Sequence, residues 1–138
     1  MSTPVKEFTS YLQAIDTHDR DAVRDAYADD VQIAAPGVEL RGRDAAAAWI
    51  DVFLRAFPDL KHEILATVQC GDAVATEARF TATHTGPLAS PNGDIPPTGK
   101  PVALDYVDVT RFADGRIASE HIYFDQVAFL SQLGLLPT

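Results

Sequence analysis

Two runs of β-branched and aromatic residues alternate with polar residues in the C-terminal part of the chain, over residues 101–112 and 116–125. Alternation with a period of two residues is typical of a β-strand that is buried on one face. The pair Asp114-Gly115 between the runs favours a tight turn. The pattern therefore predicts a β-hairpin, and the rest of the chain is organised around it.

The length of the hairpin loop decides which residues face one another. A three-residue loop over residues 113–115, with Gly115 in the left-handed conformation, sets Asp108 opposite Glu120. This is the register that we predict. A two-residue loop at Asp114-Gly115 would slip the pairing and bring His121 opposite Asp108. In the predicted register one face carries Leu104, Tyr106, Asp108, Glu120, Ile122 and Phe124.

Apolar residues at helical spacing predict two helices in the N-terminal part of the chain. Thr3 is a favourable helix cap and Pro4 suits the first helical position, so the first helix should begin there. Its apolar stripe consists of Val5, Phe8, Tyr11, Leu12 and Ile15. Asp19 can cap a second, short helix that carries Val23 and Tyr27.

Two further helices are predicted later in the chain. A third helix should span residues 44–57 and end at Pro58, because proline cannot continue a helix. Asp125 suits the N-cap of a last helix over residues 126–133, closed by Gly134 and Pro137.

Strands are predicted over residues 31–33, 38–40, 61–70 and 73–84. Pro36-Gly37 should form the turn between the first two, and Gly71-Asp72 the turn between the last two. Residues 85–100 hold four prolines and three glycines, which indicates a loop rather than a broken strand. A loop of this length in a small domain is usually functional or mobile.

The order of these elements predicts an α+β fold, in which helices cover one face of a curved, mostly antiparallel sheet. A curved sheet with helices on its concave face encloses a pocket. The face of the hairpin that carries Asp108 and Glu120 would line it.

Composition limits the classes of function. The chain has 138 residues, which suits one domain over residues 1–138, and a net charge of −9, which disfavours nucleic acid or an anionic membrane as a partner. No apolar run approaches the roughly 20 residues of a membrane span, and we expect no signal peptide and a cytoplasmic location. One cysteine, Cys70, and four scattered histidines predict neither a disulfide nor a metal site.

Several short motifs, in order, resemble the SnoaL-like polyketide cyclases, which share a superfamily with nuclear transport factor 2 and ketosteroid isomerase. They are Phe57-Pro58-Asp59-Leu60, Thr83-His84-Thr85-Gly86, Ile95-Pro96-Pro97-Thr98-Gly99-Lys100, Arg111-Phe112 before Asp114-Gly115-Arg116-Ile117, and Gln132-Leu133-Gly134. The resemblance implies a cone-shaped α+β barrel, commonly a homodimer, that usually works without a metal or an organic cofactor.

The resemblance also implies positions for catalytic groups. Cyclases that close a ring by aldol condensation, and the related limonene-epoxide hydrolases, carry a catalytic aspartate at the position of Ile122. Residues 11–12, 27–30 and 104–112 are similar to parts of ketosteroid isomerase. That similarity implies an oxyanion hole made by Tyr11 and Asp108, whereas the position of the isomerase's general base is Ala35.

Four residues are the candidate catalytic groups. Asp108, kept neutral by apolar surroundings, could donate a hydrogen bond to an enolate together with Tyr11. Glu120 is the candidate general acid or base, because two carboxyls at close range cannot both ionise comfortably. His84 could move a proton. Each of the four also has a structural interpretation, as a sheet, rim or core residue. The predicted pocket lining is Tyr106, Trp49, Ile122, Phe124 and Tyr27.

These observations favour a cofactor-independent enzyme that performs enolate chemistry, either aldol ring closure or isomerisation, on a hydrophobic molecule with a carbonyl group. Epoxide hydrolysis is a less favoured activity. The alternative is a binding protein that has kept the pocket and lost the chemistry, which Ile122 and Ala35 support. A dimeric interaction module has less support, because the hairpin still carries inward-facing acids.

Overall fold

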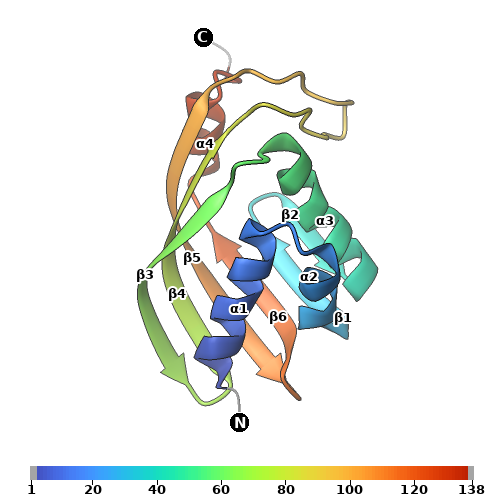
Figure 1. Ribbon diagram of the computed structural model, residues 1–138, viewed down its shortest axis with the longest axis vertical. Helices are drawn as coiled ribbons and strands as arrows, with labels where there is room; N and C mark the ends of the chain where they lie inside the picture. Colours follow the sequence, from blue (N-terminus) through green and yellow to red (C-terminus); the bar gives the residue numbers. More distant parts are fainter. Residues whose placement is uncertain (1–2, 137–138) are drawn as a thin grey trace.

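The computed structural model describes residues 3–136 as four helices and a six-stranded sheet (Figure 1). In chain order the elements are α1 (Pro4–Asp16), α2 (Arg20–Ala26), β1 (Tyr27–Ala35), β2 (Val38–Arg41), α3 (Arg43–Ala56), β3 (Lys61–Cys70), β4 (Ala73–Thr83), β5 (Pro101–Ala113), β6 (Arg116–Tyr123) and α4 (Gln126–Gln132). None of these helices is long and apolar enough to cross a membrane.

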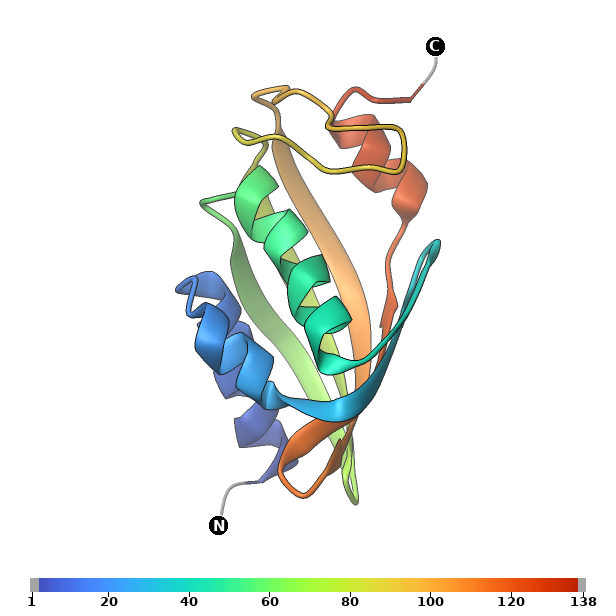
Figure 2. The same cartoon turned by 90° about the vertical axis from the view of Figure 1, so that its right-hand side faces the viewer.

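The strands form one curved sheet in the order β2-β1-β6-β5-β4-β3. Neighbouring strands are antiparallel except β1 and β6, which are parallel. The predicted α+β class is therefore confirmed, although the sheet is not closed into a complete barrel and β2 and β3 form its edges. Figures 1 and 2 show α1, α2 and α3 on the concave side of the sheet, with α4 at the same end as the loop between β4 and β5.

The predicted helix caps are confirmed. Thr3 accepts a hydrogen bond from the backbone N–H of Lys6 at the start of α1, Asp19 caps α2, and Asp125 caps α4. Placing Tyr27 in the second helix was wrong: its backbone is extended and it begins β1, with its side chain fully buried. The predicted role of Pro137 lies outside the described residues.

The turn of the β5–β6 hairpin differs from the prediction. Asp114 and Gly115 both have positive φ, at 52° and 77°, and Ala113 pairs with Arg116. Two consecutive residues with positive φ are typical of a two-residue type I′ turn. The loop therefore has two residues rather than three.

A bulge next to this turn then changes the register. Phe112 pairs with Ile117 but Arg111 pairs with Ser119, so β6 carries one extra residue, Ala118. Beyond the bulge Thr110 pairs with Glu120 and Asp108 pairs with Ile122. Neither register considered from the sequence is correct. The predicted face is nevertheless correct, because a shift of two residues keeps each side chain on its side of the sheet.

The segment between β4 and β5 has no regular structure apart from a bridge between Leu88 and Ile95. Its two ends are tied together by backbone hydrogen bonds between His84 and the residues Gly99 and Lys100. Its start is also tied to α3, since the N–H groups of Thr85 and Gly86 donate to the carbonyl of Ala56 at 3.2 and 3.0 Å. This close approach fixes the loop against the end of α3.

Gly86→Ala is expected to destabilise the protein by roughly 3 kcal/mol, the upper end of what overpacking usually costs. A methyl group at this position would lie 1.8 Å from the backbone carbonyl oxygen of Arg55, so either the loop or the last turn of α3 must move. Urea unfolding measures the change, with Ala89→Ser at an exposed site of the same loop as control. An unchanged midpoint would show that the loop is not held against α3.

Candidate active site

A cavity lies between the helices and the concave face of the sheet and encloses roughly 700 Å³, including its open mouth. Its wall is mostly apolar and is contributed by α1, α3, α4 and every strand from β3 to β6. The apolar lining consists of Leu12, Ile15, Trp49, Ile50, Phe53, Leu60, Phe80, Leu104, Ile122, Phe124 and Phe129. The polar lining consists of Tyr11, His62, Tyr106, Asp108 and Glu120. A cavity of this composition suits a hydrophobic ligand with few polar groups.

Two carboxyls occupy the buried side of this wall. Asp108 on β5 is 2% exposed and Glu120 on β6 is 1% exposed. The Thr110 hydroxyl donates to Asp108 Oδ1 at 2.7 Å, and the Tyr11 hydroxyl donates to Glu120 Oε1 at 3.1 Å. Behind Tyr11, the Tyr27 hydroxyl lies 2.5 Å from the Tyr11 hydroxyl. Because Tyr11 donates to Glu120, Tyr27 donates to Tyr11.

Burial decides the protonation of the pair. It raises the pKa of Glu120 well above its ordinary value, and the charge of Asp108 and the hydrogen bond between the two raise it further. Burial also raises the pKa of Asp108, although hydrogen bonds from Glu120 and Thr110 partly offset this. Glu120 is therefore the member of the pair that holds a proton more strongly, and it donates that proton to Asp108.

The three phenols of the site are neutral donors. Burial raises the pKa values of Tyr11 and Tyr27 well above the usual value, and the charge of Glu120 adds to this. The pKa of Tyr106 is raised by burial and then by the charge of Asp108. One side of the cavity thus presents phenol groups that stay protonated.

The structure gathers three of the four candidate catalytic residues, Tyr11, Asp108 and Glu120, in one hydrogen-bonded group. The carboxyl that Tyr11 contacts is that of Glu120, whereas the sequence paired Tyr11 with Asp108. Among the pocket residues predicted from the sequence, Tyr106, Trp49, Ile122 and Phe124 line the cavity. Tyr27 lies behind Tyr11 and does not form part of the wall.

His84 is not part of the cavity wall, because the chain turns away from the sheet at the end of β4. Its ring is fully buried against Phe57, with ring centres 5.4 Å apart. The backbone N–H of Thr98 donates to Nδ1 at 3.2 Å, so the ring proton sits on Nε2, which has no partner within residues 3–136. Burial lowers the pKa of His84 and keeps it neutral. These contacts hold the loop between β4 and β5 in place. They do not bring His84 close to Tyr11, Asp108 or Glu120.

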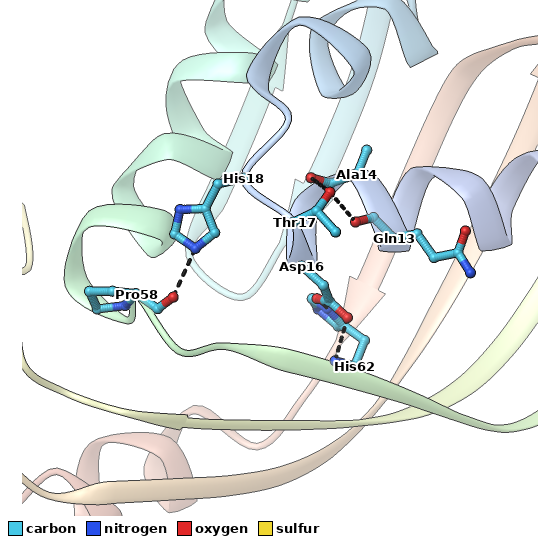
Figure 3. A network of polar contacts seen from close by, with 7 residues as sticks. All are labelled: Gln13, Ala14, Asp16, Thr17, His18, Pro58 and His62. Atoms are coloured by element: carbon cyan, nitrogen blue, oxygen red, sulfur yellow. Dashed lines mark hydrogen bonds and ion pairs between the residues drawn. The ribbon is translucent and has the colours of Figure 1, made fainter.

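His62 is a functional candidate that the sequence analysis missed. It lies at the second position of β3 and lines the cavity, and its ring Nδ1 is 2.6 Å from Asp16 Oδ1 at the end of α1 (Figure 3). A signal was present: Asp16 follows Leu12 by one helical turn, and His62 follows the buried Leu60 by one strand period. Nothing in the sequence indicates that the two positions meet. Within residues 3–136 no cluster of three or more His, Cys, Asp or Glu side chains could hold a metal.

The molecule has the α+β fold that solved structures described as ketosteroid isomerase-like and ntf2-like also have. The chain belongs to the SnoaL-like polyketide cyclase family, whose model matches residues 7–133. The resemblance stated from the sequence motifs is thereby confirmed. No curated protein matches the chain in sequence.

Solved structures show the same fold. IdmH from Streptomyces antibioticus, described as "a putative polyketide cyclase", is 27% identical with a TM-score of 0.79, covering 96% of this chain and 99% of its own. A "Putative SnoaL-like polyketide cyclase" from Jannaschia sp. CCS1 is 22% identical with a TM-score of 0.84, over 97% and 93% of the two chains. AclR from Streptomyces galilaeus, "a putative hydroxylase", is 24% identical with a TM-score of 0.80, over 98% and 87%.

Proposed function

We propose that this protein is a cyclase-type enzyme that stabilises an enolate formed from a hydrophobic, carbonyl-bearing small molecule, without a cofactor. The observation that carries the proposal is the Glu120 carboxyl, buried beside Asp108 and hydrogen-bonded to Tyr11, in a mostly apolar cavity where burial raises its pKa. The reaction is aldol ring closure or double-bond isomerisation. The family and the similarity to IdmH support the cyclase class.

The polar group suits a carbonyl oxygen that becomes negative during the reaction. A carboxylic acid kept neutral by burial can donate a hydrogen bond at pH 7, and a phenol with a raised pKa does the same. Such donors are fixed before the reaction and act where water does not compete, so each contributes about 3–4 kcal/mol to transition-state stabilisation. Glu120 is the donor: its proton, which Asp108 accepts in the free protein, turns to the substrate oxygen, while Tyr11 and Tyr27 hold the Glu120 carboxyl in position.

The first test follows exchange of the hydrogens next to the carbonyl of 2-tetralone, a planar apolar ketone, in D₂O by proton NMR. We expect the wild-type protein to accelerate exchange well above the buffer rate, because an enolate must form for each exchange. Carbon-detected titration of the side-chain carboxyls should show Glu120 titrating far above an ordinary glutamate. Absence of exchange by a protein that binds 2-tetralone, or a normal titration of Glu120, would contradict the proposal.

A binding protein without catalysis is the second candidate. It is favoured by Ile122, which lines the cavity at the position where the related cyclases carry their catalytic aspartate. If the protein only binds its ligand, 2-tetralone should bind and be recovered without deuterium at the carbons next to its carbonyl. The same experiment therefore separates the two functions.

A further inference from the structure

We propose that His62 is the general base that removes the proton next to the substrate carbonyl, and that Asp16 is the residue that positions it. The proposal rests on the proposed enolate chemistry and supplies the proton acceptor that Ile122 and Ala35 cannot provide.

The contact between Asp16 and His62 has two hydrogen bonds. The ring Nδ1 of His62 donates to Asp16 Oδ1 at 2.6 Å, and the backbone N–H of His62 donates to Asp16 Oδ2 at 3.0 Å. The His62 side chain is 9% exposed and that of Asp16 is 23% exposed. Both carboxylate oxygens are therefore occupied by one residue, which fixes the plane of the ring and places the proton of the neutral ring on Nδ1.

The remaining ring nitrogen is available to a ligand. Nε2 lies on the side of the imidazole away from Asp16 and has no hydrogen-bond partner within residues 3–136. His62 lines the cavity, where its ring centre is 5.6 Å from that of Phe80 and 6.0 Å from that of Tyr106. A carboxylate that holds the other ring nitrogen in this way gives a histidine the tautomer and orientation in which it can act as a general base.

His62 and the acid pair line the same cavity. Tyr106, in contact with His62, lies two residues before Asp108 on the same face of β5, which corresponds to about 6.6 Å along a strand. Burial raises the pKa of Asp108, and a positive charge on His62 partly offsets that rise, so the two side chains lie within electrostatic range of one another. A substrate whose carbonyl oxygen binds at Glu120 therefore occupies the same cavity as the ring of His62.

The proton transfer balances without a further reactant. The electron pair of the C–H bond forms the double bond of the enolate, the carbonyl π pair moves to oxygen, and the proton moves to Nε2 of His62. In isomerisation that proton returns to the far carbon of the conjugated system. In ring closure the enolate carbon attacks a second carbonyl carbon, and the proton goes to the new alkoxide oxygen.

The exchange assay with 2-tetralone tests both residues. His62→Gln should lower the exchange rate at least about a hundredfold, within the usual contribution of a general base. His121→Gln is the matched control, because His121 is exposed on the opposite face of the sheet and should leave the rate unchanged. Exchange by His62→Gln at the wild-type rate would overturn the proposal while leaving the enolate chemistry intact.

Asp16→Asn separates positioning from packing. The single oxygen of asparagine must accept the backbone N–H of His62, so its NH₂ group faces Nδ1 and forces the ring proton onto Nε2. We expect the exchange rate to fall at least about tenfold with little change in KM, because the base is blocked while the contact persists. If Asp16 only packs α1 against β3, Asp16→Asn should be less stable but exchange 2-tetralone at the normal rate. That result would overturn the assignment of Asp16 as the positioning residue.

A readout independent of activity is the nitrogen-15 NMR spectrum of the His62 ring. We expect Nε2 to be unprotonated in the neutral ring and to shift when 2-naphthol, an analogue of the enol of 2-tetralone, is added. A proton on Nε2, or no shift with saturating 2-naphthol, would overturn the proposal even if the wild-type protein showed no exchange. If the wild-type protein showed no exchange but the His62 ring gave the expected nitrogen-15 spectrum, the result would count against the enolate chemistry and not against the tautomer and ligand contact of His62.

Discussion

Asp108→Leu is expected to lower the exchange rate of 2-tetralone at least about tenfold while the protein remains folded. In the wild-type protein Asp108 accepts hydrogen bonds from Glu120 and Thr110, and its charge, after burial, raises the pKa of Glu120. Leucine has a similar size and fills the site, but Glu120 then loses the neighbouring charge that raises its pKa. Glu120 therefore holds its proton less strongly and is a weaker donor to the enolate.

The effect on folding should be small, because two changes oppose one another. The substitution leaves the buried hydroxyl of Thr110 without its partner, which costs about 1–3 kcal/mol, but it also removes a carboxyl whose burial is unfavourable. Asp105→Leu is the matched control, since Asp105 is exposed on the other face of β5 and forms only a surface ion pair with Arg79. A normal exchange rate for Asp108→Leu would remove the acid pair from the proposed mechanism.

Glu120→Gln should remove much of the pH dependence of stability. The folded-state pKa of Glu120 is raised well above the unfolded value of about 4.3. Between the two values the folded protein binds one more proton than the unfolded chain, so the free energy of unfolding falls as pH rises through that window. Below the unfolded pKa both states are protonated, and the loss is absent.

Glutamine keeps the hydrogen bonds and cannot ionise. Its oxygen can accept from Tyr11 and its NH₂ group can donate to Asp108. The variant should therefore match the wild-type protein near pH 4 and exceed it at pH 8 by at least about 1.4 kcal/mol, the equivalent of one unit of pKa.

Urea unfolding at the two pH values measures the difference in stability between Glu120→Gln and the wild-type protein. Glu77→Gln, at an exposed position of β4, is the control and should follow the wild-type curve. If Glu120→Gln also followed that curve, Glu120 would be ionised in the folded protein, and it could not act as a donor at neutral pH.

The sequence alone determined the local elements and the side of the sheet that each residue faces. Thr3, Asp19 and Asp125 act as helix caps through hydrogen bonds from backbone N–H groups three residues away. Both partners of each bond lie within one helical turn, so these caps could be predicted from the local sequence. The faces of β5 were predictable because side chains alternate with a period of two. That period also explains why Asp108 and Glu120 share a face although their predicted pairing was wrong.

Only the tertiary structure decided how distant groups meet. The extra residue Ala118 sets the register of β6, and nothing in the sequence distinguishes it from its neighbours. The contact between Asp16 and His62 joins residues 46 positions apart, and that between Tyr11 and Glu120 joins residues 109 apart. Such pairs depend on how α1 packs into the curve of the sheet, which is fixed by the shape of the whole core. The protonation of Glu120 depends on the same packing, because burial of the carboxyl is the largest cause of its raised pKa.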